Sequence, residues 1–350
     1  MTDPVSWEGD TLASSFACAS AQEPIPGAWR QELAQAVRDP AILWRELQLD
    51  PAFLPAAQLA TQQFPLLVPR DYVARMQIGN LNDPLLRQIL PVAEERQLVP
   101  GFSADPLAET ACGPVAGMLH KYHGRVLLVT TGACAVHCRY CFRRHFAYDE
   151  LPRGKAWWAD AVAYIAADSS IEEVLLSGGD PLTLPDLQLA ALMAAIEQIP
   201  HVQRMRLHTR LPIVLPNRVD RALLTWLTAS RLHPVVVVHA NHPAEISMNV
   251  VAACRRLRDA GVTVLNQSVL LAGINDDSHT LSKLSQRLFA AGVLPYYLHV
   301  LDHVAGAAHF LIDDARACQL HAQMAARLPG YLVPRLVREE PGQAGKTWLR

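Results

Sequence analysis

Short apolar runs alternate with helical stretches along the chain from about residue 125 onwards. The apolar runs are typical of buried parallel strands, and they lie at residues 125–131, 172–179, 202–209, 233–240, 262–271 and 295–301. Between them, the pattern predicts helices, which include residues 184–199, 218–231 and 244–261. Strands that alternate with helices indicate repeated βα units around a parallel sheet.

Six such units are too few for a closed eight-stranded barrel. The predicted fold is therefore α/β, an open partial (β/α)6 barrel of the TIM type over residues 111–330. Its functional face would lie at the C-terminal ends of the strands. Residues 1–110 carry many prolines and helix-like segments, so we expect a mainly helical N-terminal region there, and residues 331–350 would form a short C-terminal loop.

Composition and charge narrow the possible partners. The 350 residues are 51% hydrophobic and 18% charged, with a net charge of −2 and no block of like charge. Nucleic acid and membrane surfaces are therefore not expected as partners. The N-terminal stretch "MTDPVSWEGDTLASS" lacks the basic and apolar regions of a signal peptide, and no apolar run has the length of a membrane span. We expect a cytoplasmic protein.

Three cysteines are crowded into eight positions directly after the first predicted strand, in "CAVHCRYC": Cys134, Cys138 and Cys141. Disulfides are rare in the cytoplasm, so clustered cysteines are better interpreted as metal ligands. The scattered cysteines are expected to be buried thiols, and they are Cys18, Cys112, Cys254 and Cys318.

The number of clustered cysteines bears on which metal they would hold. A structural zinc site usually has four ligands in two pairs, and zinc remains an alternative here. Three thiolates from one loop can instead hold three irons of a [4Fe–4S] cluster and leave the fourth iron open to a small molecule.

Lys346 stands in a glycine-containing stretch, "VREEPGQAGKTWLR". A nucleotide-binding loop that ends in Gly-Lys-Thr would need glycine at position 340, where the chain has Glu340. Two interpretations stay open for Lys346: a solvated surface lysine, or a Schiff base with pyridoxal 5′-phosphate (PLP).

The cysteine loop resembles the signature of the radical S-adenosylmethionine (SAM) superfamily. The stretches "DPLLRQILP", "HGRVLLVTTGACAVHCRYCFRRHF", "LLSGGDPL", "NQSVLLAGIND" and "PYYLHVLDHVAGAAHF" further resemble the lysine 2,3-aminomutase family, over residues from about 65 to 346. This resemblance implies a partial barrel of the radical SAM type that binds a [4Fe–4S] cluster, SAM and PLP. It also implies a flavodoxin- or ferredoxin-type reductant as a partner.

The resemblance assigns cofactor-binding roles by position, beyond the three cysteines as cluster ligands. Tyr140 would lie against the adenine of SAM, and the glycine-rich turn "SGGD" would hold the methionine amino group of SAM; its residues are Ser177, Gly178, Gly179 and Asp180. Lys346 would be the catalytic residue that carries PLP, and Arg125 would bind the PLP phosphate. His239 and Gln267 match positions of the cofactor pocket more loosely.

Three further residues match substrate-binding positions of the family. Arg143 would pair with the α-carboxylate of L-lysine, while Asp302 and Glu339 would hold its ε-ammonium group. The implied reaction converts L-α-lysine to (R)-β-lysine by migration of the amino group from Cα to Cβ.

Within the family, "CRYCFRRHF" and "REEPGQAGK" resemble a bacterial branch that supplies β-lysine for translation elongation factor P, to which a partner ligase attaches it. A catabolic lysine 2,3-aminomutase that acts on free lysine is the first alternative. A glutamate 2,3-aminomutase is a weaker one, because Asp302 and Glu339 would repel an acidic side chain. An iron–sulfur electron carrier and a zinc-stabilised binding module are the non-enzymatic alternatives.

Overall fold

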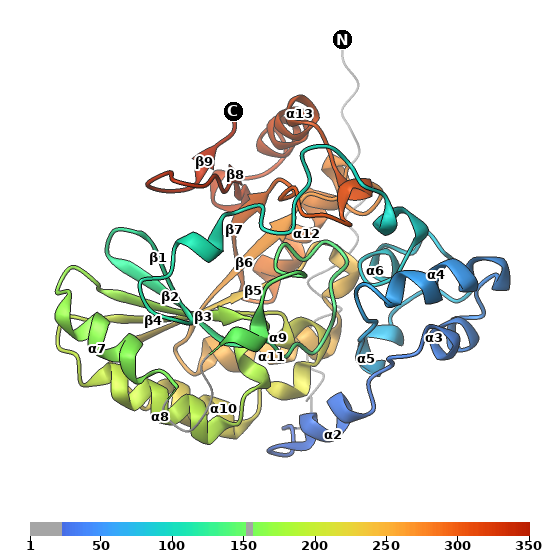
Figure 1. The fold of residues 1–350 in the computed structure, drawn as a ribbon. Helices are drawn as coiled ribbons and strands as arrows, with labels where there is room; N and C mark the ends of the chain where they lie inside the picture. Colours follow the sequence, from blue (N-terminus) through green and yellow to red (C-terminus); the bar gives the residue numbers. More distant parts are fainter. Residues whose placement is uncertain (1–22, 152–156) are drawn as a thin grey trace, which may run out of the picture.

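The computed structural model describes residues 23–151 and 157–350. A single nine-stranded sheet forms its centre, and the strands follow one another in chain order from β1 to β9 (Figure 1). The strands are β1 Met118–Tyr122, β2 Arg125–Thr131, β3 Glu173–Gly178, β4 Arg204–Thr209, β5 His233–Val238, β6 Thr263–Val269, β7 Leu294–His299, β8 Arg335–Arg338 and β9 Thr347–Trp348.

The six predicted strands correspond to β2 through β7, and all of their neighbouring pairs are parallel. Strand β8 adds a seventh parallel strand beside β7, which the sequence did not predict. Strands β1 and β9 are antiparallel to their neighbours and lie at the two edges of the sheet. The predicted α/β partial barrel is confirmed, and it is larger by one parallel strand.

Helices between the strands cover the sheet. They are α7 Ala159–Ala167, α8 Asp186–Glu197, α9 Leu211–Val214, α10 Arg221–Thr228, α11 Met248–Asp259, α12 Ser278–Ala290 and α13 Asp314–Ala325. Several begin where a side chain accepts a hydrogen bond from a free backbone N–H of the first turn. Asp277 accepts from Thr280 N in α12, and Ser247 accepts from Val250 N in α11. The apolar faces of α7 to α12 pack on the sheet in one large core of buried residues. Helix α13 packs in a second core, with Leu298 of β7 and Leu336 of β8.

Short helices precede the sheet and lie beside the barrel (Figure 1). They are α2 Ala28–Ala34, α3 Pro40–Leu47, α4 Leu54–Thr61, α5 Arg70–Val73 and α6 Pro84–Arg87. The 3-10 helices are η1 Pro51–Phe53, η2 Ala93–Arg96, η3 Glu109–Ala111, η4 Tyr148–Glu150, η5 Pro181–Thr183, η6 Pro216–Arg218, η7 Pro243–Glu245, η8 Ala308–Phe310 and η9 Gly330–Leu332. Residues 1–22 of the predicted N-terminal region, with Cys18, lie outside the described residues.

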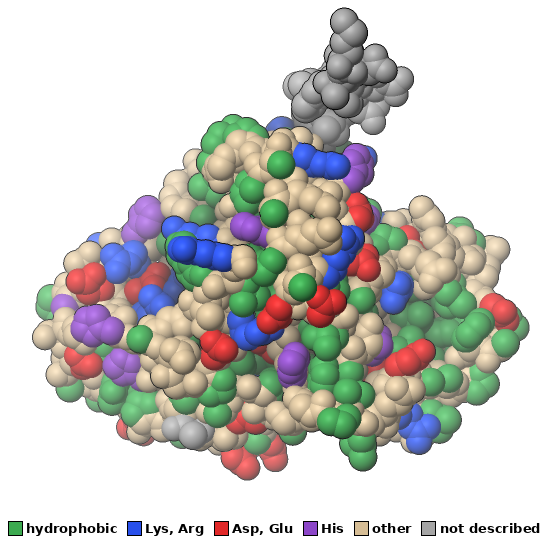
Figure 2. Space-filling model, turned by 90° about the horizontal axis from the view of Figure 1, so that it is seen from above, with side chains coloured by type: hydrophobic (Ala, Val, Ile, Leu, Met, Phe, Trp, Pro, Cys, Tyr) green, Lys and Arg blue, Asp and Glu red, His purple; other side chains and the backbone are tan. Residues whose placement is uncertain are grey.

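The surface agrees with the balanced charge of the sequence. Figure 2 shows acidic and basic side chains interspersed on one face of the molecule, so that face has no extended area of a single charge. In the described part of the chain, none of the helices has the length and apolar character that crossing a bilayer requires.

Candidate active site

A cavity of about 470 Å3 lies among the ends of the parallel strands. Residues that directly follow strands contribute to its wall, such as His239 after β5. The structure brings all of the predicted site residues together in this wall, and they are Arg125, Cys134, Cys138, Tyr140, Cys141, Arg143, Ser177, Gly178, Gly179, Asp180, His239, Gln267, Asp302, Glu339 and Lys346.

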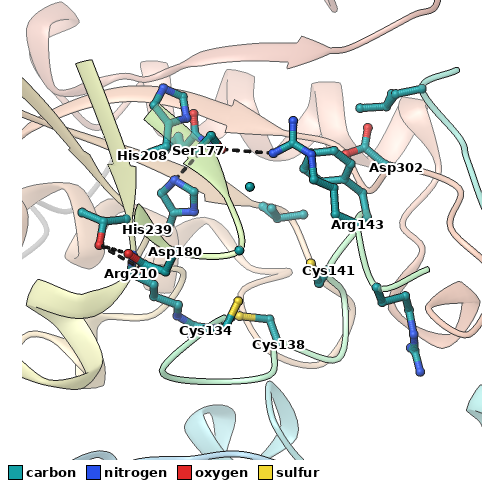
Figure 3. Close-up of a pocket in the computed structure, with 18 of the residues that line it drawn as sticks. Cys134, Cys138, Cys141, Arg143, Ser177, Asp180, His208, Arg210, His239 and Asp302 are labelled. Atoms are coloured by element: carbon teal, nitrogen blue, oxygen red, sulfur yellow. Dashed lines mark hydrogen bonds between the residues drawn. The ribbon is translucent and has the colours of Figure 1, made fainter. Parts of the chain in front are cut away.

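The three cysteines lie on the loop that follows β2, and Figure 3 shows their sulfur atoms on the same side of this loop. None of the three forms a disulfide. Burial, together with the neighbouring cysteines, raises the pKa of the Cys134 thiol well above its usual value and that of Cys141 to about 11. Arg210 donates a hydrogen bond of 2.7 Å to Cys138 Sγ, which places a positive charge beside this sulfur.

Arginines of the same loop anchor it to the N-terminal region. Arg139 is fully buried and donates from Nε and Nη2 to the two carboxylate oxygens of Glu95, at 2.8 and 2.5 Å. Arg144 Nη2 donates to the same carboxylate at 2.6 Å. Because Glu95 lies in η2, these pairs fix the cysteine loop against the segment that precedes the barrel. Such bidentate pairs have defined geometry.

The glycine-rich turn after β3 packs directly on the cysteine loop. A side chain at Gly179 would place its Cβ 2.4 Å from Ala133 O, so only glycine fits there. Gly178 has a φ of +116°, a conformation that favours glycine as well. Asp180 is buried and accepts hydrogen bonds from Thr209 Oγ1 at 2.7 Å and from Arg210 N at 2.7 Å. Burial raises the pKa of Asp180 to about 6. Its carboxylate therefore holds the turn in place.

The last two strands explain how Lys346 reaches the cavity. Antiparallel pairing of Val337 with Trp348 brings the residue that follows β8 close to the residue that precedes β9. These residues are Glu339 and Lys346, and Lys346 Nζ donates to Glu339 Oε2 at 2.6 Å. Lys346 Nζ also lies 5.7 Å from the centre of the Tyr297 ring. The terminal lysine is thus held in the barrel and is not a solvated surface charge.

Opposite shifts in pKa distinguish the two carboxylates that were predicted to bind an ammonium group. Burial, followed by the charge of Glu339, raises the pKa of Asp302 to about 7. Burial would also raise the pKa of Glu339, but the ammonium groups of Lys346 and Lys121 lower it to about 2. Glu339 is therefore an ionised partner of lysines, whereas none of the described cations is in hydrogen-bond contact with the carboxyl group of Asp302.

Histidines form part of the cavity wall. His239 Nε2 lies 3.1 Å from Gln267 Nε2, and the rings of His239 and His208 are 5.9 Å apart in an edge arrangement. Burial lowers the pKa of His239 to about 3, so this ring is neutral. Within the described residues, the Nε2 atoms of His208 and His299 are buried without a hydrogen-bond partner. These nitrogens are available to a molecule in the cavity.

Sequence reasoning missed several residues of the cavity wall, above all Glu109 and Lys121. Glu109 accepts hydrogen bonds from Arg143 Nε at 2.6 Å and from Arg143 Nη2 at 2.8 Å. Lys121 Nζ donates to Glu109 Oε1 at 3.1 Å and to Glu339 Oε1 at 3.3 Å. Neither residue belongs to a motif, so their placement emerges only from the folded structure.

The chemistry of the side chains fits the [4Fe–4S] cluster and the PLP that the resemblance implies. Three thiols without disulfide partners provide soft ligands suited to separate irons of a cluster. Among the described residues, no group of three His, Cys, Asp or Glu side chains is placed to hold a single metal ion. A lysine amine, an arginine and unpartnered histidine nitrogens line the remainder of the same cavity.

The chain is similar to several known proteins. The sequence pattern of the Radical SAM superfamily matches residues 128–284. L-lysine 2,3-aminomutase of Escherichia coli (strain K12) is 48% identical over 322 residues, which are 92% of this chain and 94% of that protein. L-lysine 2,3-aminomutase of Haemophilus influenzae is 46% identical over 329 residues, 93% of this chain and 97% of that protein. A solved radical SAM methyltransferase from Sphaerobacter thermophilus is 18% identical, with a TM-score of 0.44 over 63% of this chain and 68% of that chain.

Proposed function

This chain belongs to the lysine 2,3-aminomutase family of radical SAM isomerases, and we propose that it converts L-α-lysine to (R)-β-lysine with the help of PLP. The observation that carries the proposal is that one cavity is lined both by the three cysteines and by Lys346, Arg143 and Asp302. The radical SAM superfamily uses a [4Fe–4S] cluster and SAM. PLP is the additional requirement that we infer.

Each cofactor has candidate ligands in the cavity. Cys134, Cys138 and Cys141 would hold three irons of the cluster, and the loop that carries them is fixed by the buried arginine–glutamate pairs. Lys346 would hold PLP as a Schiff base, and Arg125 would bind its phosphate. When bound, the cluster with SAM supplies a 5′-deoxyadenosyl radical, and PLP supplies a ring that delocalises an unpaired electron.

Tyr140 and the turn from Ser177 to Asp180 are the proposed SAM-binding residues. The structure adds a reason for the position of Tyr140: its hydroxyl accepts a hydrogen bond of 2.6 Å from Asn241 Nδ2, which fixes the ring. His239 and Gln267 are the proposed polar contacts of the cofactor pocket. The neutral state of His239 lets it exchange hydrogen bonds without placing another positive charge in the cavity.

The substrate would be bound at its two charged ends. Arg143 offers N–H groups to the α-carboxylate, which a guanidinium binds through two parallel hydrogen bonds. Asp302 lies in the same wall and would pair with the ε-ammonium group, with Glu339 as the second acid. Figure 3 shows Arg143 and Asp302 on the same side of the cavity. Binding at both ends orients Cα and Cβ and displaces water from the cavity.

Electrostatics favour lysine over glutamate as the substrate. Glu339 is ionised, and an acidic substrate side chain beside it and Asp302 would be repelled. The ε-ammonium group of lysine instead lowers the pKa of Asp302, because an opposite charge nearby stabilises the carboxylate. Binding therefore releases a proton from Asp302 when the ligand-free carboxyl is protonated.

We place this chain in the branch that supplies β-lysine for translation elongation factor P, with a β-lysine ligase as the next enzyme. The support is the motif resemblance of "CRYCFRRHF" and "REEPGQAGK" to that branch. A cytoplasmic location and a flavodoxin- or ferredoxin-type reductant belong to the same proposal. A catabolic role would use the same chemistry on free lysine, and the fate of the product distinguishes the two.

The test is an anaerobic incubation of the chain, reconstituted with iron, sulfide and PLP, with L-lysine, SAM and dithionite. Chiral chromatography should detect (R)-β-lysine. Protein that carries iron and PLP and forms 5′-deoxyadenosine, yet yields no β-lysine, would refute the reaction. The assignment to the elongation factor P branch is tested by deleting the gene and measuring the intact mass of elongation factor P by mass spectrometry. The factor should lose the mass of one β-lysyl group. An unchanged mass would favour the catabolic alternative.

A further inference from the structure

Glu109 is a buried carboxylate for which the proposed function has no role. It lies in η3, ahead of the barrel, and only 5% of its surface is exposed. Its two oxygens accept from Nε and Nη2 of Arg143 at 2.6 and 2.8 Å, and one of them accepts from Lys121 Nζ at 3.1 Å. A buried charge with this set of partners is costly to remove, so its position is well determined.

The pairing leaves one particular edge of Arg143 free. A guanidinium has five N–H groups, and it can bind one carboxylate along its Nε–Nη edge and another along its Nη1–Nη2 edge. Glu109 occupies the Nε–Nη2 edge, and Arg143 Nη1 donates one N–H to Ser177 Oγ at 3.0 Å (Figure 3). These hydrogen bonds leave one N–H on Nη1 and one on Nη2 for a second carboxylate.

The segment that carries Glu109 is fastened to the barrel near the other substrate-binding residue. Ser103 N donates to His303 O at 2.9 Å, and Ala305 N donates to Ser103 O at 2.8 Å. Asp105 then accepts from Glu109 N at 2.9 Å. His303 directly follows Asp302. The backbone segment that carries Glu109 is therefore hydrogen-bonded to the loop that carries Asp302. These hydrogen bonds hold the segment that carries Glu109 beside the loop that carries Asp302.

The ion pairs point the same way. Arg143 and Lys121 both pair with Glu109, and Lys121 pairs with Glu339 as well. Lys121 therefore has a second acid, whereas Glu109 is the acid that pairs with Arg143 in the described part of the chain. Without Glu109, Arg143 would keep its hydrogen bond to Ser177 but would lose the two that fix its Nε–Nη2 edge.

We propose that Glu109 is a positioning residue that holds Arg143 with its Nη1–Nη2 edge available for the substrate α-carboxylate. The inference rests on the proposed function, because it takes Arg143 to be the carboxylate-binding residue. The competing possibility is that Glu109 occupies the place of the substrate carboxylate and must leave before lysine binds. The two possibilities predict opposite changes in affinity.

The test compares Glu109→Gln with the wild type and with Glu172→Gln. Glu172 pairs with Arg204 at 3.1 Å at an exposed site and does not line the cavity, so Glu172→Gln controls for the loss of an arginine–glutamate pair. In Glu109→Gln, we expect KM for L-lysine to rise about tenfold to a hundredfold, as for the loss of a hydrogen-bonded charge. We expect kcat to change by less than about threefold, and Glu109→Asp to recover part of the affinity.

A carboxylate-free analogue shows whether the effect is specific. The inhibition constant of 1,5-diaminopentane, which lacks the α-carboxylate, should be the same in Glu109→Gln and wild type, as should the iron and PLP contents. A KM for lysine that stays the same in both variants at position 109 would overturn the proposal, and a lower KM would show that Glu109 competes with substrate.

Equilibrium dialysis with L-lysine and with 1,5-diaminopentane separates this inference from the proposed function. Wild-type protein that binds lysine more tightly than the diamine but does not isomerise it would refute the proposed function, and the Glu109→Gln dissociation constants would still decide the inference. Wild-type protein that does not prefer lysine over the diamine would refute both.

Discussion

Asp302 should couple the stability of the protein to its ability to bind lysine. Its pKa is raised to about 7 by burial and by the charge of Glu339, whereas an aspartate in the unfolded chain titrates near its ordinary value of about 4. A group whose folded pKa is raised contributes stability below its unfolded pKa, and this contribution is lost as the pH rises through the folded pKa. Ionisation of Asp302 therefore destabilises the ligand-free protein between about pH 4 and pH 7.

The size of this effect follows from the shift. About three pKa units correspond to about 4 kcal/mol at pH 8, and water that enters the cavity screens the carboxyl and reduces the effect to about 2 kcal/mol. Asp302→Asn keeps the shape of the side chain without its charge. The variant should be more stable than wild type by about 2 kcal/mol at pH 8 and equally stable at pH 4, as measured by urea unfolding of the ligand-free protein.

The same substitution should abolish a pH dependence of substrate binding. If only ionised Asp302 accepts the ε-ammonium group, the apparent KM for lysine scales inversely with the ionised fraction, and it rises about tenfold from pH 8 to pH 6. Asp302→Asn should lose this dependence and about a hundredfold in kcat/KM at pH 8. An Asp302→Asn variant that is less stable than wild type at pH 8, or that keeps the pH dependence of KM, would refute the reasoning.

Two further predictions concern the cofactors. Cys138→Ala should retain little iron after anaerobic reconstitution, because two thiolates do not hold a cubane cluster; four irons per chain, measured by colorimetric assay, would contradict the ligand assignment. Lys346→Ala should fold, as judged by circular dichroism, but should carry no pyridoxyl group after borohydride reduction. Peptide mapping that finds the pyridoxyl group on another lysine of the wild type would contradict the role of Lys346.

The local sequence pattern was sufficient to predict strands β2 to β7. Strands β8 and β9 were not predicted, because they depend on pairing with other strands. Strands β3 and β5 have nearly continuous buried runs, whereas β4 and β6 alternate buried with half-buried residues. Both patterns are typical of strands. Strand β8 is only Arg335–Arg338, with an arginine at each end, and it becomes a strand by pairing with β7. Strand β9 has two residues and exists through its pairing with β8. Such short strands have no pattern of their own that a sequence could display.

The residues of the candidate site also differ in whether the sequence reveals them. The three cysteines lie on one loop, so their spacing in the sequence was enough to identify them as candidate metal ligands. For Lys346 the sequence left two interpretations open, a solvated surface lysine and a Schiff base with PLP. The β8–β9 pairing sets its amine against Glu339 in the cavity wall, which excludes the first interpretation, and the second stays a prediction. Glu109 had no signal, because its partners lie elsewhere: Arg143 is 34 residues away along the chain, and Lys121, its second partner, contacts Glu339 across 218 residues.

Those long-range contacts suggest why the acids of this cavity are arranged in alternation with cations. Arg143, Glu109, Lys121, Glu339 and Lys346 form an unbroken series of ion pairs with alternating sign. If Lys346 were to hold PLP as proposed, Lys121 would still be in place to neutralise the carboxylate of Glu339. Asp302 has no pair in this series. In the proposed function, the ε-ammonium group of lysine would pair with Asp302, and its α-carboxylate would pair with Arg143. The arrangement of charges is therefore consistent with the two ends of an amino acid that has a basic side chain.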